Sequence, residues 1–266
     1  MKIAIINHKG GVGKTTIAVN TAFRYKEKKQ QILLVDADLQ HNSMQLISGY
    51  TWDGENEVWR DPTELITATT ELICGIRNYP EDVIFDCSPS FEASKTFIGY
   101  LQEEKINIDL YLIPVNSRMS IIGADTIIKN IKQKYSDARV VLIPYNFENN
   151  TLSEKDRAQL VRFPNVEVYS QVIPHHNKGL ALFEQNGGKP IWKFYSGSRF
   201  AVQMRELADW IRCGCINEIT RVKGKEKIGG VINSSKILNE SGDKALNEVL
   251  KEFVKTKSNK WREYGK

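Results

Sequence analysis

The sequence has few cysteines and no long apolar run. The four cysteines, at positions 74, 87, 213 and 215, lack the paired spacing of a metal site, and Cys213 and Cys215 are too close together for a CxxC motif. We therefore expect reduced, structural thiols. No stretch approaches the ~20 apolar residues of a membrane span, and the first residues enter a predicted strand without a signal segment. These absences lead us to expect a cytosolic protein.

The net charge is concentrated near the C-terminus. Residues 1–216 contain 25 Lys and Arg residues and 25 Asp and Glu residues, so their formal charges cancel. Residues 217–266 contain 12 basic and seven acidic residues and therefore carry the whole net charge of +5. A chain of 266 residues is long enough for one large domain with a well-buried core. We predict one domain over residues 1–216 and a basic extension over residues 217–266.

A glycine-rich segment at residues 9–16, KGGVGKTT, has the composition of a phosphate-binding loop. Its three glycines allow backbone N–H groups to turn toward phosphate oxygens, Lys14 suits the β- and γ-phosphates, and the Thr15 hydroxyl suits Mg²⁺. The loop follows an apolar run at residues 2–7 and precedes a segment with helical spacing at residues 16–25. This is the strand–loop–helix context that such a loop requires.

Two further apolar runs end in aspartates. Residues 31–40 include Asp36 and Asp38, and residues 82–87 include Asp86. Because the carboxyl ends of parallel strands lie at one edge of the sheet, these carboxylates are expected beside the phosphate loop. The structural alternative is a capped turn after each strand.

Strands and helices alternate along the rest of the domain. Residues 109–115, 139–146 and 166–174 have the β-branched composition of strands, while residues 120–135 and 152–162 read as helices. Such alternation predicts an α/β fold, with a mostly parallel twisted sheet and helices on both faces. Together with the loop, it indicates a P-loop NTPase fold.

Lys9 is not explained by an ordinary phosphate loop. It is expected to point away from the phosphates that its own chain holds, so it is either a solvated charge or a contact to a nucleotide in another subunit. The string KGGVGKTT resembles the deviant Walker A motif of the ParA/MinD family of ATPases, and the resemblance extends over about residues 1–213. It implies a homodimer formed with ATP, in which Lys9 reaches the nucleotide of the partner subunit.

The resemblance also implies roles for the acidic residues. The segment around Asp36 is similar to the family's Asp-x-Asp-Pro-Gln motif, with Leu39 in place of the proline. By this similarity Asp38 orients the attacking water, whereas Thr15, Asp36 and Asp86 belong to the Mg²⁺ site. The implied catalytic residues are Lys9, Lys14 and Asp38. The implied ATP contacts are Gly10, Gly11, Val12, Gly13, Lys14, Thr15, Thr16 and, near the adenine, Asn146.

Basic residues near the end of the domain suggest a surface for nucleic acid. ParA-type partition ATPases hold nonspecific DNA with such residues, and the corresponding candidates here are Lys193, Arg199, Arg205 and Arg212. Arg205 and Arg212 are seven residues apart, which places them on one face of a helix. Arg221 and Lys223 of the extension are further candidates. Taken singly, each arginine is better explained as a surface charge or ion-pair partner.

Three interpretations of the extension compete. Residues 220–227 are densely basic, and residues 243–257 have helical spacing with one apolar stripe. The helix can pack on the domain or on a second subunit, the basic residues can bind DNA phosphates, or the helix can lie on a membrane surface as in the MinD branch.

The leading hypothesis is a ParA-type ATPase for plasmid or chromosome partition. It would bind nucleoid DNA nonspecifically as an ATP dimer, require Mg²⁺, and hydrolyse ATP weakly until stimulated by a ParB-type centromere-binding protein. The alternative is a MinD-like, membrane-associated regulator of cell division. An iron–sulfur reductase related to the nitrogenase iron protein is disfavoured, because Cys74 and Cys87 do not resemble its cluster ligands. A metabolic ligase is a further alternative.

Overall fold

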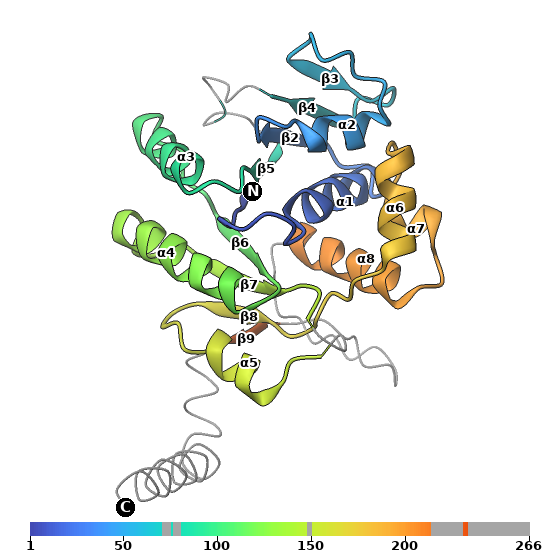
Figure 1. The fold of residues 1–266 in the computed structure, drawn as a ribbon. Coiled ribbons are helices and arrows are strands. Elements are labelled where there is room, and N and C mark those ends of the chain that lie inside the picture. Colours follow the sequence, from blue (N-terminus) through green and yellow to red (C-terminus); the bar gives the residue numbers. More distant parts are fainter. Residues whose placement is uncertain (71–75, 77–80, 148–150, 214–230, 234–266) are drawn as a thin grey trace, which may run out of the picture.

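The computed structural model describes residues 1–70, 76, 81–147, 151–213 and 231–233 (Figure 1). Several features predicted above lie outside these residues: the helix at 243–257, Arg221, Lys223, Cys74 and Cys215.

A single sheet of nine strands forms the centre of the described part of the chain. The strand order is β3-β4-β2-β5-β1-β6-β7-β8-β9, and every pair is parallel except β3 with β4 and β8 with β9. The strands are β1 (Lys2–Ile5), β2 (Ile32–Ala37), β3 (Val58–Arg60), β4 (Ile66–Thr69), β5 (Asp82–Cys87), β6 (Leu110–Val115), β7 (Val140–Pro144), β8 (Glu167–Tyr169) and β9 (Val231–Asn233). Because β1 lies between β5 and β6, the loops after these three strands meet at one edge of the sheet.

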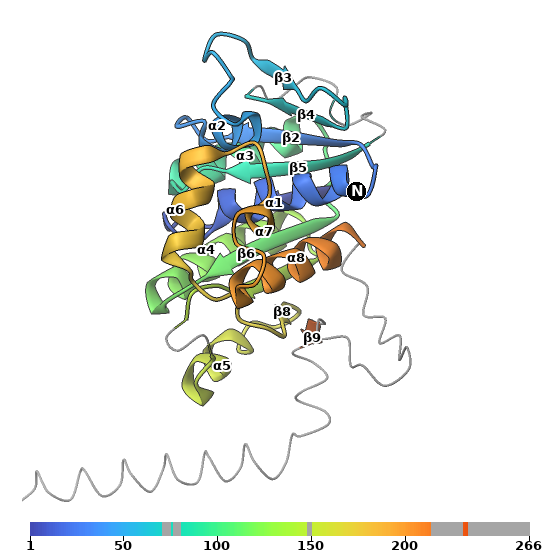
Figure 2. The ribbon, with the colours of Figure 1, turned by 90° about the vertical axis from the view of Figure 1, so that its right-hand side faces the viewer.

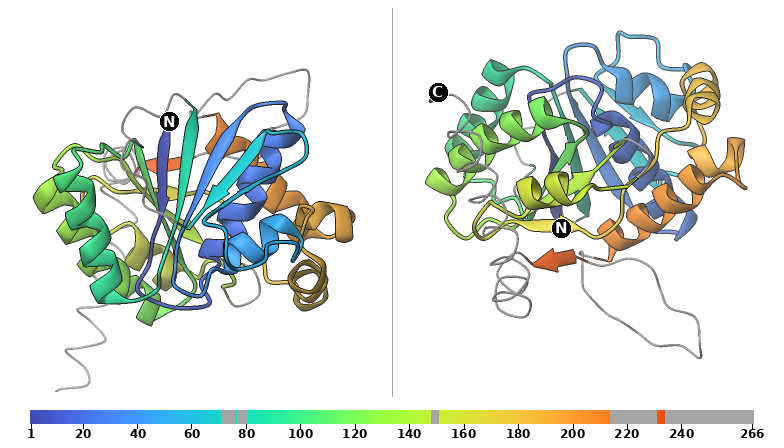
Figure 3. Two further views of the ribbon diagram at one scale, coloured as in Figure 1. Left: turned by 90° about the horizontal axis from the view of Figure 1, so that it is seen from above. Right: turned by 60° about the horizontal axis from the view of Figure 1, so that its bottom comes forward.

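Helices cover both faces of the sheet (Figures 2 and 3). One face packs against α1 (Lys14–Glu27), α2 (Asn42–Ser48), α6 (Asn177–Asn186), α7 (Ile191–Phe194) and α8 (Arg199–Arg212). The other face packs against α3 (Phe91–Glu103), α4 (Arg118–Lys134) and α5 (Glu154–Leu160). The predicted α/β fold with a mostly parallel sheet and helices on both faces is confirmed.

The core lies in two layers, one on each side of the sheet. Along β1 and the residue after it, Ile3 and Ile5 belong to one apolar cluster, whereas Ala4 and Ile6 belong to the other. All four side chains are fully buried. A strand buried on both faces carries a continuous apolar run, which explains why residues 2–7 show no alternation of polar and apolar residues.

The structure differs from the sequence-based prediction at several elements. The predicted strand at 166–174 is confined to β8, and beyond it only an isolated bridge joins Tyr145 to Ile173. The short strands β3 and β4 and the helices α2, α3, α6 and α7 were not predicted. Strand β9 pairs with β8, so the segment assigned to the extension contributes a strand to the sheet of the domain. Among the helices of the described residues, none has both the length and the apolar character needed to cross a bilayer.

Candidate nucleotide-binding site

The loop between β1 and α1 requires glycine for its conformation. Gly11 and Gly13 have φ angles of 69° and 92°, in the left-handed region that other residues rarely adopt. A Cβ atom at Gly13 would lie 2.9 Å from the ring of Tyr145, whereas a Cβ atom at Gly10 or Gly11 would meet nothing within 4 Å. The Tyr145 ring therefore supports the loop from one side, and the side next to Gly10 and Gly11 has room for a ligand.

The N-terminus of α1 is arranged to bind an anion. Its N-cap residue, Gly13, offers no side-chain acceptor, and its first turn contains no acidic residue. The first N–H groups of a helix lack intrahelical partners and lie at the positive end of the helix dipole, so they favour a phosphate. This geometry agrees with the predicted role of the loop.

Lys14 is almost completely buried at the start of α1. Its side chain is 6% exposed, and Nζ donates a hydrogen bond to the backbone oxygen of Lys9 over 3.2 Å. Burial lowers the pKa of Lys14, against the attraction of Asp86 and other nearby acidic groups. Within the described residues the ammonium donates to a neutral carbonyl, and the nearby acidic groups only partly offset the cost of its burial. A phosphate group would supply the missing counter-charge.

Asp36 and Asp86 form a buried carboxylate pair on neighbouring strands. They are register partners in the pairing of β2 with β5, and each residue is only 1% exposed. Asp36 accepts hydrogen bonds from the backbone N–H groups of Met44, at 2.9 Å, and Asp38, at 3.2 Å. Within the described residues, neither carboxylate oxygen of Asp86 has a well-aligned hydrogen-bond donor. The pair thus concentrates negative charge where few protein groups neutralise it.

The pKa values of these carboxyl groups reflect that arrangement. Burial, and then the charge of Asp36, raise the pKa of Asp86 to about 7, although the Thr15 hydroxyl and the Lys14 ammonium oppose the shift. Burial likewise raises the pKa of Asp36, against the hydrogen bonds that it accepts. Both shifts would be relieved by a cation at this edge of the sheet.

The available ligands fit Mg²⁺. Within the described part of the chain no group of three or more His, Cys, Asp or Glu residues could hold a metal ion by itself. Mg²⁺ is commonly held by one or two carboxylates together with water and substrate phosphates, so a complete protein cage is not required. The unpaired oxygens of Asp86, the adjacent Asp36 and the Thr15 hydroxyl are the residues that would hold it.

Asp38 lies beside this pair, in the loop after β2. It is half-buried, its backbone N–H group binds Asp36, and its Oδ1 atom accepts a hydrogen bond from the Gln40 N–H group at 3.3 Å. The charge of Asp38 contributes to the raised pKa of Asp86, so the two carboxylates are close. The structure thus brings the predicted acidic residues to the same edge of the sheet as the loop.

Lys9 is not a freely solvated charge in the single chain, and its predicted contact with the nucleotide of a second subunit stays a prediction. Its side chain is half-buried, and Nζ donates a hydrogen bond to the hydroxyl of Ser117 at 3.0 Å. Ser117 is the N-cap residue of α4 in the same chain. In the single chain, the surplus lysine is therefore bound to its own α4.

Asn146 follows β7 and has a left-handed backbone conformation, with φ of 53°. Its N–H group donates to the Ile173 oxygen at 2.7 Å, which joins the segments that follow β7 and β8. Because the neighbouring Tyr145 ring contacts Gly13, Asn146 is held close to the loop. Its predicted contact with the adenine stays a prediction.

Sequence reasoning missed two asparagines that hold the loop by hydrogen bonds, Asn7 and Asn116. The buried amide of Asn7 donates to the Pro114 oxygen at 2.7 Å and accepts from the Lys9 N–H group at 3.0 Å. Asn116 donates to the Gly11 oxygen at 3.4 Å. The sequence signal for Asn7 was an amide at the end of an apolar run, where an unpaired polar side chain would be costly. Asn116 and Ser117 carry no comparable signal.

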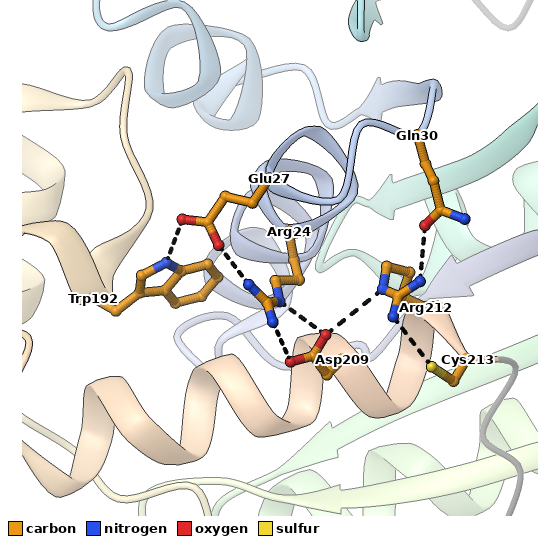
Figure 4. Close-up of polar contacts among 7 residues, drawn as sticks. All are labelled: Arg24, Glu27, Gln30, Trp192, Asp209, Arg212 and Cys213. Atoms are coloured by element: carbon orange, nitrogen blue, oxygen red, sulfur yellow. Dashed lines mark hydrogen bonds and ion pairs between the residues drawn. The ribbon is translucent and has the colours of Figure 1, made fainter.

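The candidate DNA-binding residues differ in their availability. Lys193, Arg199 and Arg205 are exposed, although Lys193 lies 4.0 Å from Glu27. Arg212 instead donates to Gln30 at 2.8 Å and lies 3.6 Å from Asp209 (Figure 4). Of the predicted pair on one face of α8, Arg205 is exposed, whereas Arg212 is held by Asp209 and by Gln30 in the segment after α1.

The same network ties α8 to the helix that begins at the phosphate loop. Arg24 of α1 forms a bidentate ion pair with Asp209, at 2.8 and 2.6 Å, and also contacts Glu27 at 2.7 Å (Figure 4). Glu27 accepts a further hydrogen bond from the Trp192 indole at 2.9 Å. The position of α8 is thereby fixed relative to α1.

A model of the CobQ/CobB/MinD/ParA nucleotide binding domain matches residues 3–186. The chain belongs to this family. The matched range contains the loop, the carboxylate pair, Asp38 and Asn146. Membership in the CobQ/CobB/MinD/ParA family confirms the resemblance noted from the KGGVGKTT segment and identifies the loop as part of a nucleotide-binding domain.

One curated protein is similar to this chain in sequence, and several solved structures are similar to it in fold. A curated protein of Methanocaldococcus jannaschii, described as uncharacterized, is 25% identical over 261 residues, which cover 79% of this chain and 97% of that protein. The fold is similar to that of the MinD cell division protein of Aquifex aeolicus, with a TM-score of 0.59, 19% identity, and coverage of 81% of this chain and 98% of that chain.

Two similar structures contain nucleotides. One is the septum site-determining protein MinD of Pyrococcus horikoshii with Mg-ADP, with a TM-score of 0.54, 15% identity, and coverage of 79% of this chain and 95% of that chain. The other is an ATP complex of Cyanothece McdA, with a TM-score of 0.56, 12% identity, and coverage of 82% and 98%. At these identities the similarity concerns the fold.

Proposed function

We propose that this protein is an Mg²⁺-dependent ATPase of ParA type, in which ATP promotes a homodimer that binds nonspecific DNA during replicon partition. The observation that carries the proposal is the buried Lys14 ammonium at the start of α1 together with the buried Asp36–Asp86 pair at the same sheet edge, where within the described residues the Asp86 oxygens lack a well-aligned donor. One site needs an anion and the other a cation, and Mg²⁺ with a nucleoside triphosphate supplies both.

The positions of the loop, Lys14 and Asp38 support a role in ATP hydrolysis. Phosphoryl transfer depends mainly on positioning and on neutralisation of charge, which the backbone N–H groups of the loop and Lys14 provide. Asp38, half-buried at the edge of the site, orients the attacking water. Thr15, Asp36 and Asp86 are the residues that would hold Mg²⁺, and the ion would supply neutralisation of phosphate charge. Turnover without a partner protein is expected to be slow.

The surface around the loop supports dimerisation. Four large apolar side chains are exposed there, in segments that follow β2, β5 and β6: Leu39 (89% exposed), Phe91 (45%), Met119 (67%) and Ile122 (48%). Phe91 contacts His8 at the base of the loop, with ring centroids 5.0 Å apart. Apolar side chains gathered around one site favour cover by another protein surface. A second copy would cover this surface and bring its Lys9 to the nucleotide.

DNA is the favoured polyanion because the excess positive charge of the chain lies in residues 217–266, while Arg199 and Arg205 are exposed on α8. Such residues neutralise phosphates without reading sequence. A ParB-type centromere-binding protein would then stimulate hydrolysis, and the DNA would be released. In this proposal the protein lies in the cytoplasm, bound to the nucleoid. A MinD-like membrane role is the competing function.

The test is binding of nonspecific duplex DNA and of anionic liposomes, each with ADP, ATP or a non-hydrolysable ATP analogue. We expect DNA to be shifted with ATP and with the analogue but not with ADP, and the affinity to fall as salt is raised. Sedimentation with liposomes in the presence of ATP, without a DNA shift, would reverse the assignment in favour of a membrane-associated regulator.

A further inference from the structure

The hydrogen bond between Lys9 and Ser117 links the phosphate loop to the first turn of α4. Ser117 begins α4 as its N-cap residue, and its hydroxyl accepts a hydrogen bond from the Ser120 N–H group at 3.4 Å. The same oxygen accepts the Lys9 ammonium at 3.0 Å. The Lys9 side chain is thereby held within its own subunit.

Neighbouring contacts hold both partners of this hydrogen bond in place. The Asn7 side chain accepts from the Lys9 N–H group at 3.0 Å and donates to the Ser120 oxygen at 3.3 Å. Asn116, just before the helix, donates to the Gly11 oxygen at 3.4 Å. Side chains thus join the region of the loop to the start of α4 at three points, and the Lys9–Ser117 contact is made by the longest and most flexible of the three donor side chains.

We propose that Ser117 is an intramolecular docking site for Lys9, which competes with the nucleotide of a partner subunit and so sets the nucleotide concentration needed for dimerisation. This inference rests on the proposed function, in which Lys9 acts in the dimer. In this proposal the Lys9 ammonium exchanges the Ser117 hydroxyl for phosphate oxygens of the nucleotide in a second subunit. Each dimer must therefore break two Lys9–Ser117 contacts.

The expected effect is moderate, because the contact is partly exposed to solvent. For a partly exposed hydrogen bond we take the range of an ordinary one, about a threefold to tenfold change in an equilibrium constant. Since the contact occurs twice in a dimer, its removal should shift the monomer–dimer equilibrium by the square of that factor. The nucleotide concentration at half-dimerisation should consequently move several-fold.

Two substitutions at Ser117 predict shifts in opposite directions. Ser117→Ala removes the acceptor for Lys9 and should lower the concentration of a non-hydrolysable ATP analogue at half-dimerisation. Ser117→Asp keeps a good N-cap residue and adds a charge opposite Lys9, so it should raise that concentration. The matched control is Ser198→Ala, which removes the N-cap side chain of α8, where the hydroxyl accepts from Ala201 and lies far from Lys9 in sequence and fold.

Sedimentation velocity across an analogue titration gives the dimer fraction, and amine labelling of the nucleotide-free monomer, read by mass spectrometry, reports the exposure of Lys9. Lys9 should be labelled faster in Ser117→Ala than in wild type and more slowly in Ser117→Asp.

A merely structural role for Ser117 would shift the analogue concentration at half-dimerisation equally in Ser117→Ala and Ser198→Ala and leave that of Ser117→Asp like wild type. This result would overturn the proposal. If the wild type itself does not dimerise with the analogue, the proposed function fails. If the wild type dimerises but Lys9 is labelled at the same rate in both Ser117 variants as in wild type, only the docking site is rejected.

Discussion

The substitution Asp86→Asn should stabilise the nucleotide-free and metal-free protein while it abolishes Mg²⁺-dependent ATP hydrolysis. Folding raises the pKa of Asp86 from 3.8 to about 7, chiefly by burial and then by the charge of Asp36. Because the folded state binds the proton more tightly, the stability associated with protonated Asp86 is fully present below about pH 4 and is lost as the pH rises through about 7. An amide at this position has no charge to desolvate, so it avoids this loss.

The size of the effect follows from the pKa difference. Each tenfold change in proton affinity corresponds to about 1.4 kcal/mol, which gives an upper bound on the order of 4 kcal/mol at pH 8. At pH 5 the ionisation of the folded protein is suppressed, and the benefit of the amide should fall to less than about half of its value at pH 8. Because Asp36 shares the buried charge, even about 2 kcal/mol at pH 8 would agree with the structure.

Urea unfolding in EDTA at pH 5 and pH 8 measures this difference. We expect the free energy of unfolding of Asp86→Asn to exceed that of wild type at pH 8, with a smaller gap at pH 5. Addition of Mg²⁺ and ATP should stabilise wild type more than the variant. A variant that is less stable than wild type at pH 8 would mean that the Asp86 carboxylate is already satisfied by the protein, and would refute the reasoning for a cation site.

Four further substitutions test other parts of the site. Gly13→Ala should weaken ATP binding at least tenfold and lower stability by about 1–3 kcal/mol, measured by calorimetry and urea unfolding, because it forces a Cβ toward Tyr145 at a positive φ. Lys14→Ala should abolish ATP binding in calorimetry, and retained binding would contradict the phosphate-loop assignment. Asp38→Ala should retain ATP binding and dimerisation but stop phosphate release in a colorimetric assay; a monomer in ATP would count against the dimer. Arg24→Ala should lower the free energy of unfolding by about 1–3 kcal/mol, since it leaves Asp209 and Glu27 without their shared partner, while ATP affinity changes little.

The sequence predicted the centre of the fold better than its edges. The strands that carry the loop and the aspartates are buried on both faces, so they appear as continuous apolar runs, and the prediction for β5 matched its bounds at Asp82–Cys87. By contrast, β3 has three residues, of which Val58 is 39% exposed, and such a strand has no clear apolar pattern. Its pairing depends on β4, which no local signal reveals.

The candidate site shows the same division between local and tertiary information. The loop and the aspartates were found because their chemistry is encoded in a short motif or at a strand end. The docking of Lys9 on Ser117 joins residues 108 positions apart and depends on the packing of α4 against β6, which is the neighbour of β1 in the sheet. Likewise, the removal of Arg212 from the exposed basic face follows from its contact with Gln30 across 182 positions. Helical spacing placed Arg212 on a face, but tertiary contacts decided where its side chain points.

Sedimentation velocity of the wild type and of Lys9→Ala, each with ADP and with a non-hydrolysable ATP analogue in Mg²⁺, tests the central claim that ATP joins two subunits through Lys9. We predict a monomer with ADP for both proteins, a dimer with the analogue for wild type, and a monomer with the analogue for Lys9→Ala despite retained nucleotide binding. A wild type that stays monomeric with the analogue, or a Lys9→Ala variant that dimerises as readily as wild type, would contradict the account.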